Sequence, residues 1–198
     1  MMFAMGILQI DQSILQAVNY FLVGKSVFVD MVIEFIAVYL VYLLPIILLV
    51  LWFKFKHRRV EIFLSFVAMA IAWFLITKTI VPNFIWFRPR PDLAAFGAKE
   101  LLFHRPDYSF PSDHATALFA LTFGFYAFGW KRAGNWFLVY ALIISFFRVT
   151  IGVHFPLDIL AGAVSALIGL GITKLLEQPI RKYVYPTVIK LLKFLRIP

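Results

Sequence analysis

The chain contains no cysteine and few charged residues, and each shortage excludes a class of protein. Without cysteine no disulfide bond can form, and the sequence carries no sign of a redox compartment. Charged residues make up 15% of the 198 residues, whereas an average soluble domain has about 25%. Because 63% of the residues are hydrophobic and the mean hydropathy is +0.90, the composition predicts an integral membrane protein.

Acidic residues are also scarce, since 10 of them stand against 19 basic residues and give a net charge of +9. Nucleic acid is a poor explanation for this excess in so apolar a chain, and we expect no nucleic-acid partner. Basic loops that orient a membrane protein, together with an anionic ligand, explain the excess better. The first ten residues lack the basic region and the small-residue cleavage site of a signal peptide, so we expect the spans themselves to direct the chain to the membrane.

Five apolar segments have about the length that a bilayer core of about 30 Å requires, which is roughly 20 residues. The predicted spans are Val27 to Phe53, Val60 to Val81, Ser112 to Trp130, Ala133 to Ile151 and Pro156 to Leu176. The last three reach full length only with their polar ends, and Pro45 favours a kink in the first. We therefore expect an all-α fold: one membrane helical bundle over residues 1–198, with about five full transmembrane helices.

Two flanking segments are predicted to lie at the membrane surface. Within residues 1–26, Ile10, Ile14 and Phe21 share one side of a helix and Asp11 and Asn19 share the other, which is typical of an amphipathic interfacial helix. Residues 178–198 carry basic residues and no acid. We interpret this tail as a basic interfacial helix, with a partner-binding tail as the alternative.

Basic residues cluster after spans one, three and five, which the positive-inside rule assigns to the cytoplasmic side. The loop over residues 82–111 then lies on the opposite side. Its basic residues are misplaced for topology and suggest an anionic ligand: Arg88, Arg90, Lys99, His104 and Arg105.

Three polar stretches meet on that same side of the predicted bundle. They are Arg88-Pro89-Arg90-Pro91, Pro111-Ser112-Asp113-His114, and the set Arg148, His154 and Asp158. Charged residues at the edge of a membrane are costly and tend to be functional. Taken singly, each stretch has a plainer explanation as a turn, a helix cap or a partner of the helix dipole. Their coincidence on one side favours a site.

The residue types suit the transfer of a phosphoryl group. Guanidinium groups bind phosphate oxygens through paired hydrogen bonds, and a helix that begins at Ser112 offers free N–H groups to an anion. Ser112 can cap this helix or donate its hydroxyl to the ligand. Asp158 lies four residues after His154 and could accept from one imidazole nitrogen, which leaves the other free to attack. His114 could then protonate the leaving oxygen.

These motifs resemble the type 2 phosphatidic acid phosphatase superfamily of membrane phosphatases. Its pattern is Lys, six residues, Arg-Pro; then Pro-Ser-Gly-His; then Ser-Arg, five residues, His, three residues, Asp. The resemblance spans Lys78 to Asp158 and implies a metal-independent lipid phosphatase without a cofactor. It implies that His154 is the nucleophile that forms a phosphohistidine, that Asp158 orients it, and that His114 is the general acid. It assigns phosphate binding to Arg88, Arg148 and Ser112, with Lys78 as a further candidate.

The chain departs from the family pattern at three positions. Asp113 replaces the glycine, Phe147 replaces the serine before Arg148, and nine residues rather than six separate Lys78 from Arg88. Three extra residues are nearly one helical turn, so Lys78 either remains on the same face or snorkels to the membrane surface.

The stretch from Pro111 to Thr116 looks like the variant found in bacterial undecaprenyl-diphosphate phosphatases. This resemblance implies a multi-pass protein of the bacterial plasma membrane, with an extracytoplasmic site and a polyprenyl diphosphate substrate. Arg90, Lys99 and Arg105 would then suit a diphosphate, and Asp113 is a further substrate-binding candidate. Glycerolipid phosphates and lipid A phosphate remain alternatives, as do a transporter, a metal hydrolase and a non-catalytic lipid-binding protein. The oligomeric state is not readable.

Overall fold

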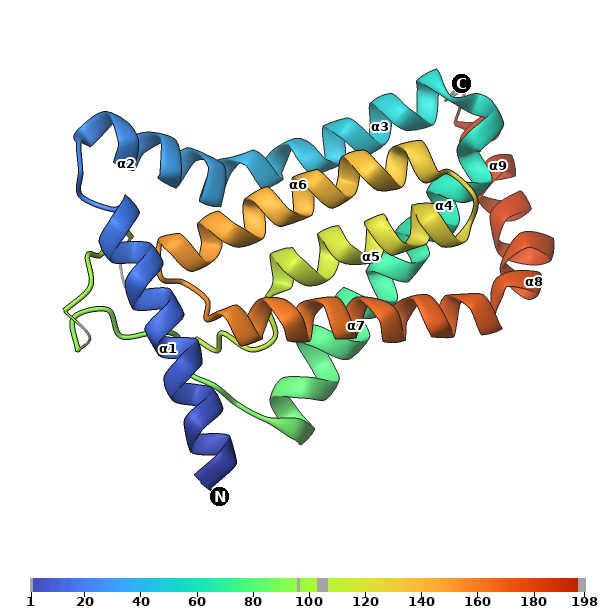
Figure 1. Ribbon diagram of the computed structural model, residues 1–198. Helices are drawn as coiled ribbons and strands as arrows, with labels where there is room; N and C mark the ends of the chain where they lie inside the picture. The colour runs from blue at the N-terminus through green and yellow to red at the C-terminus, as the bar shows by residue number, and fades with distance from the viewer. Residues whose placement is uncertain (1, 96, 103–106, 196–198) are drawn as a thin grey trace.

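The computed structural model describes residues 2–95, 97–102 and 107–195, and the regular secondary structure in these ranges is helical. Within these ranges, one isolated antiparallel β-bridge pairs Pro89 with Tyr108. Long helices run roughly side by side, with the chain connections at two opposite ends (Figure 1). The predicted all-α fold class is therefore confirmed.

The first membrane span is a continuous helix from Val27 to Lys54. It begins as α2 (Val27–Glu34), passes through the π-helical η1 (Phe35–Tyr39) and the 3₁₀-helical η2 (Leu40–Leu43), and ends as α3 (Leu44–Lys54). Proline cannot donate an N–H and clashes with the carbonyl four residues earlier, so the helix must change geometry before Pro45. The irregular turns η1 and η2 lie directly before that residue.

The second span runs from Lys56 to Ile85 through η3 (Lys56–Arg58), α4 (Arg59–Ala70) and the π-helical η4 (Ile71–Ile85). Its end lies four residues beyond the predicted end at Val81, because Pro82 is accommodated inside the wide π-helical turns. The loop predicted to begin at residue 82 therefore begins at Trp86. This end of η4 diverges from the other helices (Figure 1).

The remaining bundle helices are α5 (Asp113–Ala127), α6 (Lys131–Thr150) and α7 (Pro156–Leu175). Within the described ranges, four helices are long and apolar enough to cross a membrane, and α5, with 15 residues, is shorter. At 1.5 Å per residue α5 spans about 22 Å. It packs against α4, α6 and α7, and nine of its residues are buried. Neighbouring helices rather than lipid therefore surround the short helix.

Glycines allow α7 to approach its neighbours closely. A Cβ at Gly162 would lie 2.9 Å from the Ala115 Cβ and 3.0 Å from the Ser112 carbonyl oxygen. A Cβ at Gly169 would lie 2.8 Å from the carbonyl oxygen of Ala68. Small residues thus hold α7 against α4 and against the beginning of α5, as the sequence predicts.

The two flanking segments are helical and lie at opposite ends of the bundle (Figure 1). The N-terminal α1 (Met2–Leu22) buries Asp11, Leu15 and Asn19 against the protein, whereas Ile10 and Phe21 are more than 60% exposed. Its polar side therefore faces the bundle and its apolar side faces outward. At the other end, α8 (Glu177–Pro179), η5 (Ile180–Val184) and α9 (Tyr185–Phe194) form the C-terminal helix. The interfacial position of both segments stays a prediction.

Candidate active site

Backbone hydrogen bonds bring the three polar stretches together at one end of the bundle. The Ser109 N–H donates to the Arg88 carbonyl oxygen at 2.8 Å, so the two arms of the loop after η4 run side by side. The Ser112 N–H donates to the Asp158 carbonyl oxygen at 3.0 Å, which joins the beginning of α5 to the first turn of α7. The predicted convergence of distant segments is therefore present in the fold.

His154 lies in the turn between α6 and α7 and is 2% exposed. Its Nδ1 lies 2.9 Å from the carbonyl oxygen of Ser109 and 3.6 Å from Oδ2 of Asp158. Because a carbonyl oxygen only accepts, Nδ1 carries the proton and Nε2 keeps its lone pair. The expected contact with Asp158 is thus the longer of the two. Asp158 instead accepts from the Phe155 N–H at 2.8 Å and so fixes the turn that follows the imidazole.

The environment of His154 favours a neutral imidazole. Burial lowers the pKa of His154 well below its ordinary value, and the charges of Arg148 and Arg90 lower it further. A neutral imidazole with a free Nε2 is the form that attacks phosphorus. The surroundings therefore hold His154 in the neutral form, which could act as a nucleophile.

Arg148, near the end of α6, reaches the nucleophilic side of this imidazole. Its Nη2 lies 3.5 Å from Nε2 of His154, and its Nη1 donates to the carbonyl oxygen of Ala37 at 3.3 Å. Ala37 belongs to the π-helical η1, and such irregular turns are frequent at functional sites. An anion at Nε2 of His154 would therefore meet the Arg148 guanidinium.

His114, the second residue of α5, belongs to the same cluster. Its imidazole lies within electrostatic range of Arg148, His154, Arg90 and Lys78. The Ser112 hydroxyl caps α5 by accepting from the Ala115 N–H at 3.5 Å, which is one of the two roles predicted for it. The structure thus brings both imidazoles to one place.

The two arginines of the Arg-Pro-Arg-Pro stretch have different surroundings. Arg90 donates from Nη1 to the Val153 carbonyl oxygen at 2.8 Å and forms an ion pair with Asp107, and its charge acts on both imidazoles. Arg88 is buried and engaged by two carboxylates, Asp158 at 2.9 Å and Asp11 at 2.6 Å. Arg90 is therefore better placed than Arg88 to meet a phosphate at His154, whereas the resemblance assigned this role to Arg88.

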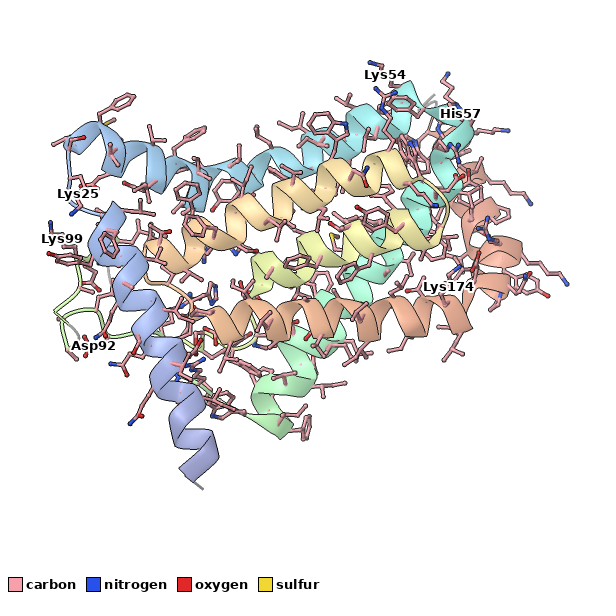
Figure 2. The ribbon with its side chains drawn as sticks, viewed as in Figure 1. Lys25, Lys54, His57, Asp92, Lys99 and Lys174 are labelled. Carbon is pink, nitrogen blue, oxygen red and sulfur yellow. The ribbon has the colours of Figure 1, made fainter. Side chains whose placement is uncertain are left out.

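The other predicted cations lie at different places. The Nζ of Lys78 lies 2.6 Å from Oδ2 of Asp113, so this lysine reaches the beginning of α5 and the edge of the site. The Nζ of Lys99 donates to the Gly24 carbonyl oxygen at 3.1 Å, at the periphery of the loop (Figure 2). His104 and Arg105 lie outside the described residues.

An apolar groove of about 340 Å³ runs along α5 from His114. Its walls come from η2 and α3 on one side and from α4 and η4 on the other, and include Leu44, Leu48, Met69 and Trp73. Three buried polar atoms of its lining residues have no hydrogen-bond partner within the described part of the chain: Trp73 Nε1, Asp113 Oδ1 and His114 Nδ1. Buried polar atoms without partners are uncommon and call for an explanation, such as a ligand.

Sequence reasoning missed several participants in this site. The carbonyl oxygens of Ser109 and Ala37 leave no sequence signal, because every residue has one. Trp73 appears in the sequence as one more membrane aromatic. Asp11 carried a signal, since it is the one charged residue between Met2 and Leu22, but its partner Arg88 is 77 positions away.

Among the described residues, no group of three His, Asp or Glu side chains is arranged to hold a metal ion. Arginine and lysine side chains provide the positive charge near the two imidazoles. The chemistry that this arrangement can perform is nucleophilic attack by a neutral imidazole on an anion held by guanidinium groups.

Known proteins resemble this chain in sequence or in fold. Undecaprenyl-diphosphatase BcrC of Bacillus subtilis is 31% identical over 140 residues, which cover 70% of each chain. Bacitracin transport permease protein BcrC of Bacillus licheniformis is 33% identical over 135 residues, or 67% of this chain and 64% of that protein. The crystal structure of LpxE from Aquifex aeolicus superposes with a TM-score of 0.63 at 23% identity, over 82% of this chain and 93% of that one, and shows the same fold. The pattern of the PAP2 superfamily matches residues 61–181. The chain therefore belongs to the PAP2 superfamily, and it is a phosphatase.

Proposed function

We propose that this protein hydrolyses a lipid diphosphate, with undecaprenyl diphosphate as its substrate and undecaprenyl phosphate as its lipid product. The observation that carries the proposal is the position of His114, which lies between the buried cluster around His154 and the apolar groove. A phosphate group held in the cluster would have its lipid chain in the groove. An alternative substrate is a monophosphate such as phosphatidylglycerophosphate, phosphatidic acid or lipid A phosphate.

In the first step, the lone pair of His154 Nε2 attacks the terminal phosphorus. A nitrogen–phosphorus bond forms, and the bond from that phosphorus to the bridging oxygen breaks. Burial and the neighbouring cations lower the pKa of His114 in the free site, so His114 takes up its proton when the anionic diphosphate binds beside it. It then gives this proton to the bridging oxygen, which leaves as lipid monophosphate. Arg148 and Arg90 hold the terminal phosphate oxygens and stabilise the charge that develops on them.

In the second step, neutral His114 takes a proton from a water molecule, whose oxygen attacks the phosphorus of phosphohistidine. The nitrogen–phosphorus bond breaks and inorganic phosphate leaves. His154 Nε2 regains its lone pair, and His114 regains the proton it lost. The Ser109 carbonyl oxygen keeps the Nδ1 proton of His154 in place throughout, so that the same nitrogen attacks in every turnover.

Charge near the groove supports a diphosphate rather than a monophosphate. Lys78 pairs with Asp113 where the groove begins, and we propose that its ammonium group binds the inner phosphate of the leaving group. The name of the B. subtilis relative, undecaprenyl-diphosphatase, agrees with this substrate class. The basic residues at the opposite end favour a cytoplasmic location for that end, and hence an extracytoplasmic active site in the bacterial plasma membrane.

The test is phosphate release by the purified protein in detergent, with undecaprenyl diphosphate, phosphatidylglycerophosphate and phosphatidic acid in parallel. We expect the diphosphate to give the highest kcat/KM. We also expect His154→Ala to lower kcat by on the order of 10⁴-fold or more, as loss of a nucleophile does. Brief reaction with terminally ³²P-labelled substrate should label the wild-type protein with an acid-labile, base-stable bond, and should leave His154→Ala unlabelled. Equal labelling of the two proteins would contradict the mechanism.

Two other functions predict different results in the same assay. A metal hydrolase would lose its activity on dialysis against EDTA, whereas we expect full activity. A transporter, the function in the name of the B. licheniformis relative, would move its ligand without releasing phosphate. Phosphate release that depends on His154 separates the proposed function from both.

A further inference from the structure

The N-terminal helix α1 contributes a buried acid to the surroundings of the active site. Asp11 is 2% exposed and uses both carboxylate oxygens: Oδ2 accepts from Nη2 of Arg88 at 2.6 Å, and Oδ1 accepts from the Leu157 N–H at 2.8 Å. Leu157 lies in the first turn of α7, where backbone N–H groups have no partner within the helix. Asp11 therefore caps α7 from another helix.

Arg88 links this acid to Asp158. Its Nη1 donates to Oδ1 of Asp158 at 2.9 Å, and its guanidinium lies 3.7 Å from the ring centroid of Phe155. Asp158 in turn accepts from the Phe155 N–H with its other oxygen, Oδ2. Asp11, Arg88 and Asp158 thus form a chain of charged hydrogen bonds around the turn that follows His154.

A second polar contact fixes the register of α1 on the bundle. Asn19 lies two turns after Asp11 on the same side of the helix and is fully buried. Its Nδ2 donates to the carbonyl oxygens of Lys99 at 2.9 Å and Thr150 at 3.0 Å, and its Oδ1 accepts from the Lys99 N–H at 2.9 Å. With Leu15 buried between them, Asp11 and Asn19 hold α1 at a defined position, so the carboxylate of Asp11 is fixed rather than mobile.

Charge explains why both carboxylates are needed at this turn. Two carboxylates and one guanidinium leave a net negative charge in a buried place, and the positive N-terminal end of α7 offsets it. Removing the charge of Asp11 would leave Arg88 with one carboxylate and free it to move. Asp158 and the turn that carries His154 would lose the support that fixes them.

We propose that Asp11 is a positioning residue for the nucleophile: through Arg88 and the first turn of α7 it fixes Asp158 and the imidazole of His154. The proposal rests on the nucleophilic role assigned to His154 above. It makes α1 a part of the catalytic apparatus, whereas the sequence suggests only a membrane-surface helix.

The experiment measures kcat and KM for undecaprenyl diphosphate in Asp11→Asn, Arg88→Gln and the double variant. Asparagine keeps an oxygen for the Leu157 N–H and removes the charge that holds Arg88. The matched control is Asp92→Asn, the same change at an exposed aspartate in the loop at this end of the molecule. Outer residues that orient reactive groups typically contribute about 10–100-fold.

We expect Asp11→Asn to lower kcat about 10–100-fold with KM within about 3-fold of the wild type, and to slow phosphoenzyme formation equally. Arg88→Gln should give a similar loss, and the double variant should be no worse than the more impaired single variant, because one chain of contacts is broken only once. Asp92→Asn should keep the wild-type rate. Asp11→Glu restores the charge and should recover part of kcat, which separates loss of positioning from loss of folding.

The proposal is wrong if Asp11→Asn turns over like Asp92→Asn, if only KM changes, if the two losses multiply in the double variant, or if Asp11→Glu is no better than Asp11→Asn. In those cases an inactive His154→Ala would leave the proposed function standing. If instead His154→Ala keeps its activity and still acquires label, the proposed function itself fails, whatever Asp11→Asn shows.

Discussion

The two ends of the bundle carry the same types of charged side chain in opposite settings. At the active-site end, Arg88 and Arg148 are each 6% exposed and Asp158 is fully buried. At the other end, Lys174 and Arg181 pair with Glu177, and their side chains are 42% and 39% exposed. Lys54, His57 and Lys174 lie at this basic end, whereas Lys25, Asp92 and Lys99 mark the periphery of the active-site end (Figure 2).

Exposure thus distinguishes the charges to which we assign membrane orientation from the charges that we assign to the active site. An exposed ion pair contributes about 0–1 kcal/mol, because water solvates both partners well when they are apart. Buried charges lose that solvation, and removing one partner of a buried pair costs about 3–5 kcal/mol. We therefore attribute the joint burial of Arg88, Arg148, Asp11 and Asp158 to the proposed function rather than to stability.

We expect the largest difference in kcat between the two ends when an arginine is replaced at each, Arg148 at the active-site end and Arg181 at the basic end. Arg148→Ala removes the guanidinium next to Nε2 of His154, and we expect kcat to fall by on the order of 10²–10³-fold, as for loss of one donor to a developing oxyanion. Arg181→Ala removes the same group at the basic end and should leave kcat within about 2-fold of the wild type. Phosphate release by the two purified variants measures the contrast.

Arg148→Lys tests whether the charge alone or the shape of the guanidinium is required. Lysine keeps the charge and loses the fork that binds two oxygens, so its kcat should stay well below that of the wild type. Equal activity of Arg148→Ala and Arg181→Ala would mean that burial does not mark the functional arginine.

The sequence predicted the fold class and the meeting of three segments because both depend on patterns along the chain. Apolar segments of membrane length predicted the helices, and the spacing of Arg148, His154 and Asp158 placed them at one end. The resemblance assigned phosphate binding to Arg88, although Arg90 also precedes a proline. The structure gives the two arginines different surroundings, because Asp11, far away in the sequence, pairs with Arg88.

The sequence also could not predict which backbone groups contact the site residues. The spacing of four residues favoured Asp158 as the partner of Nδ1 of His154, yet the carbonyl oxygen of Ser109 is closer. Pro82 was expected to end a helix, and the π-helical η4 accommodates it. In both cases contacts or geometry in the folded protein differ from what a rule based on neighbouring residues predicts.

A smaller effect is expected from pH, through the burial of His154. Because the pKa of His154 is well below 6.5 in the folded protein, the unfolded chain binds the proton more tightly. As the pH falls below about 6.5, this residue should therefore reduce the free energy of unfolding, by up to about 1.4 kcal/mol per pH unit. Thermal unfolding between pH 6.5 and pH 5 measures the slope, which His154→Gln should reduce.

His57, exposed at the basic end, supplies the control for this measurement. His57→Gln should leave the pH slope of the wild type unchanged. A slope that survives in His154→Gln would show that another group whose pKa burial lowers, such as the imidazole of His114, dominates the acid sensitivity of the active-site end.

The smallest effect is expected at the basic end, where Glu177 accepts from Lys174 at 2.9 Å and from Arg181 at 2.8 Å. Glu177→Gln removes the charge from both pairs and should lower the free energy of unfolding by less than about 1 kcal/mol, with no change in kcat. Salt of about 1 M, where screening acts over about 3 Å, should abolish most of that difference. A loss above 3 kcal/mol that salt does not reduce would place Glu177 with the buried charges, and the contrast between the two ends would then no longer follow exposure.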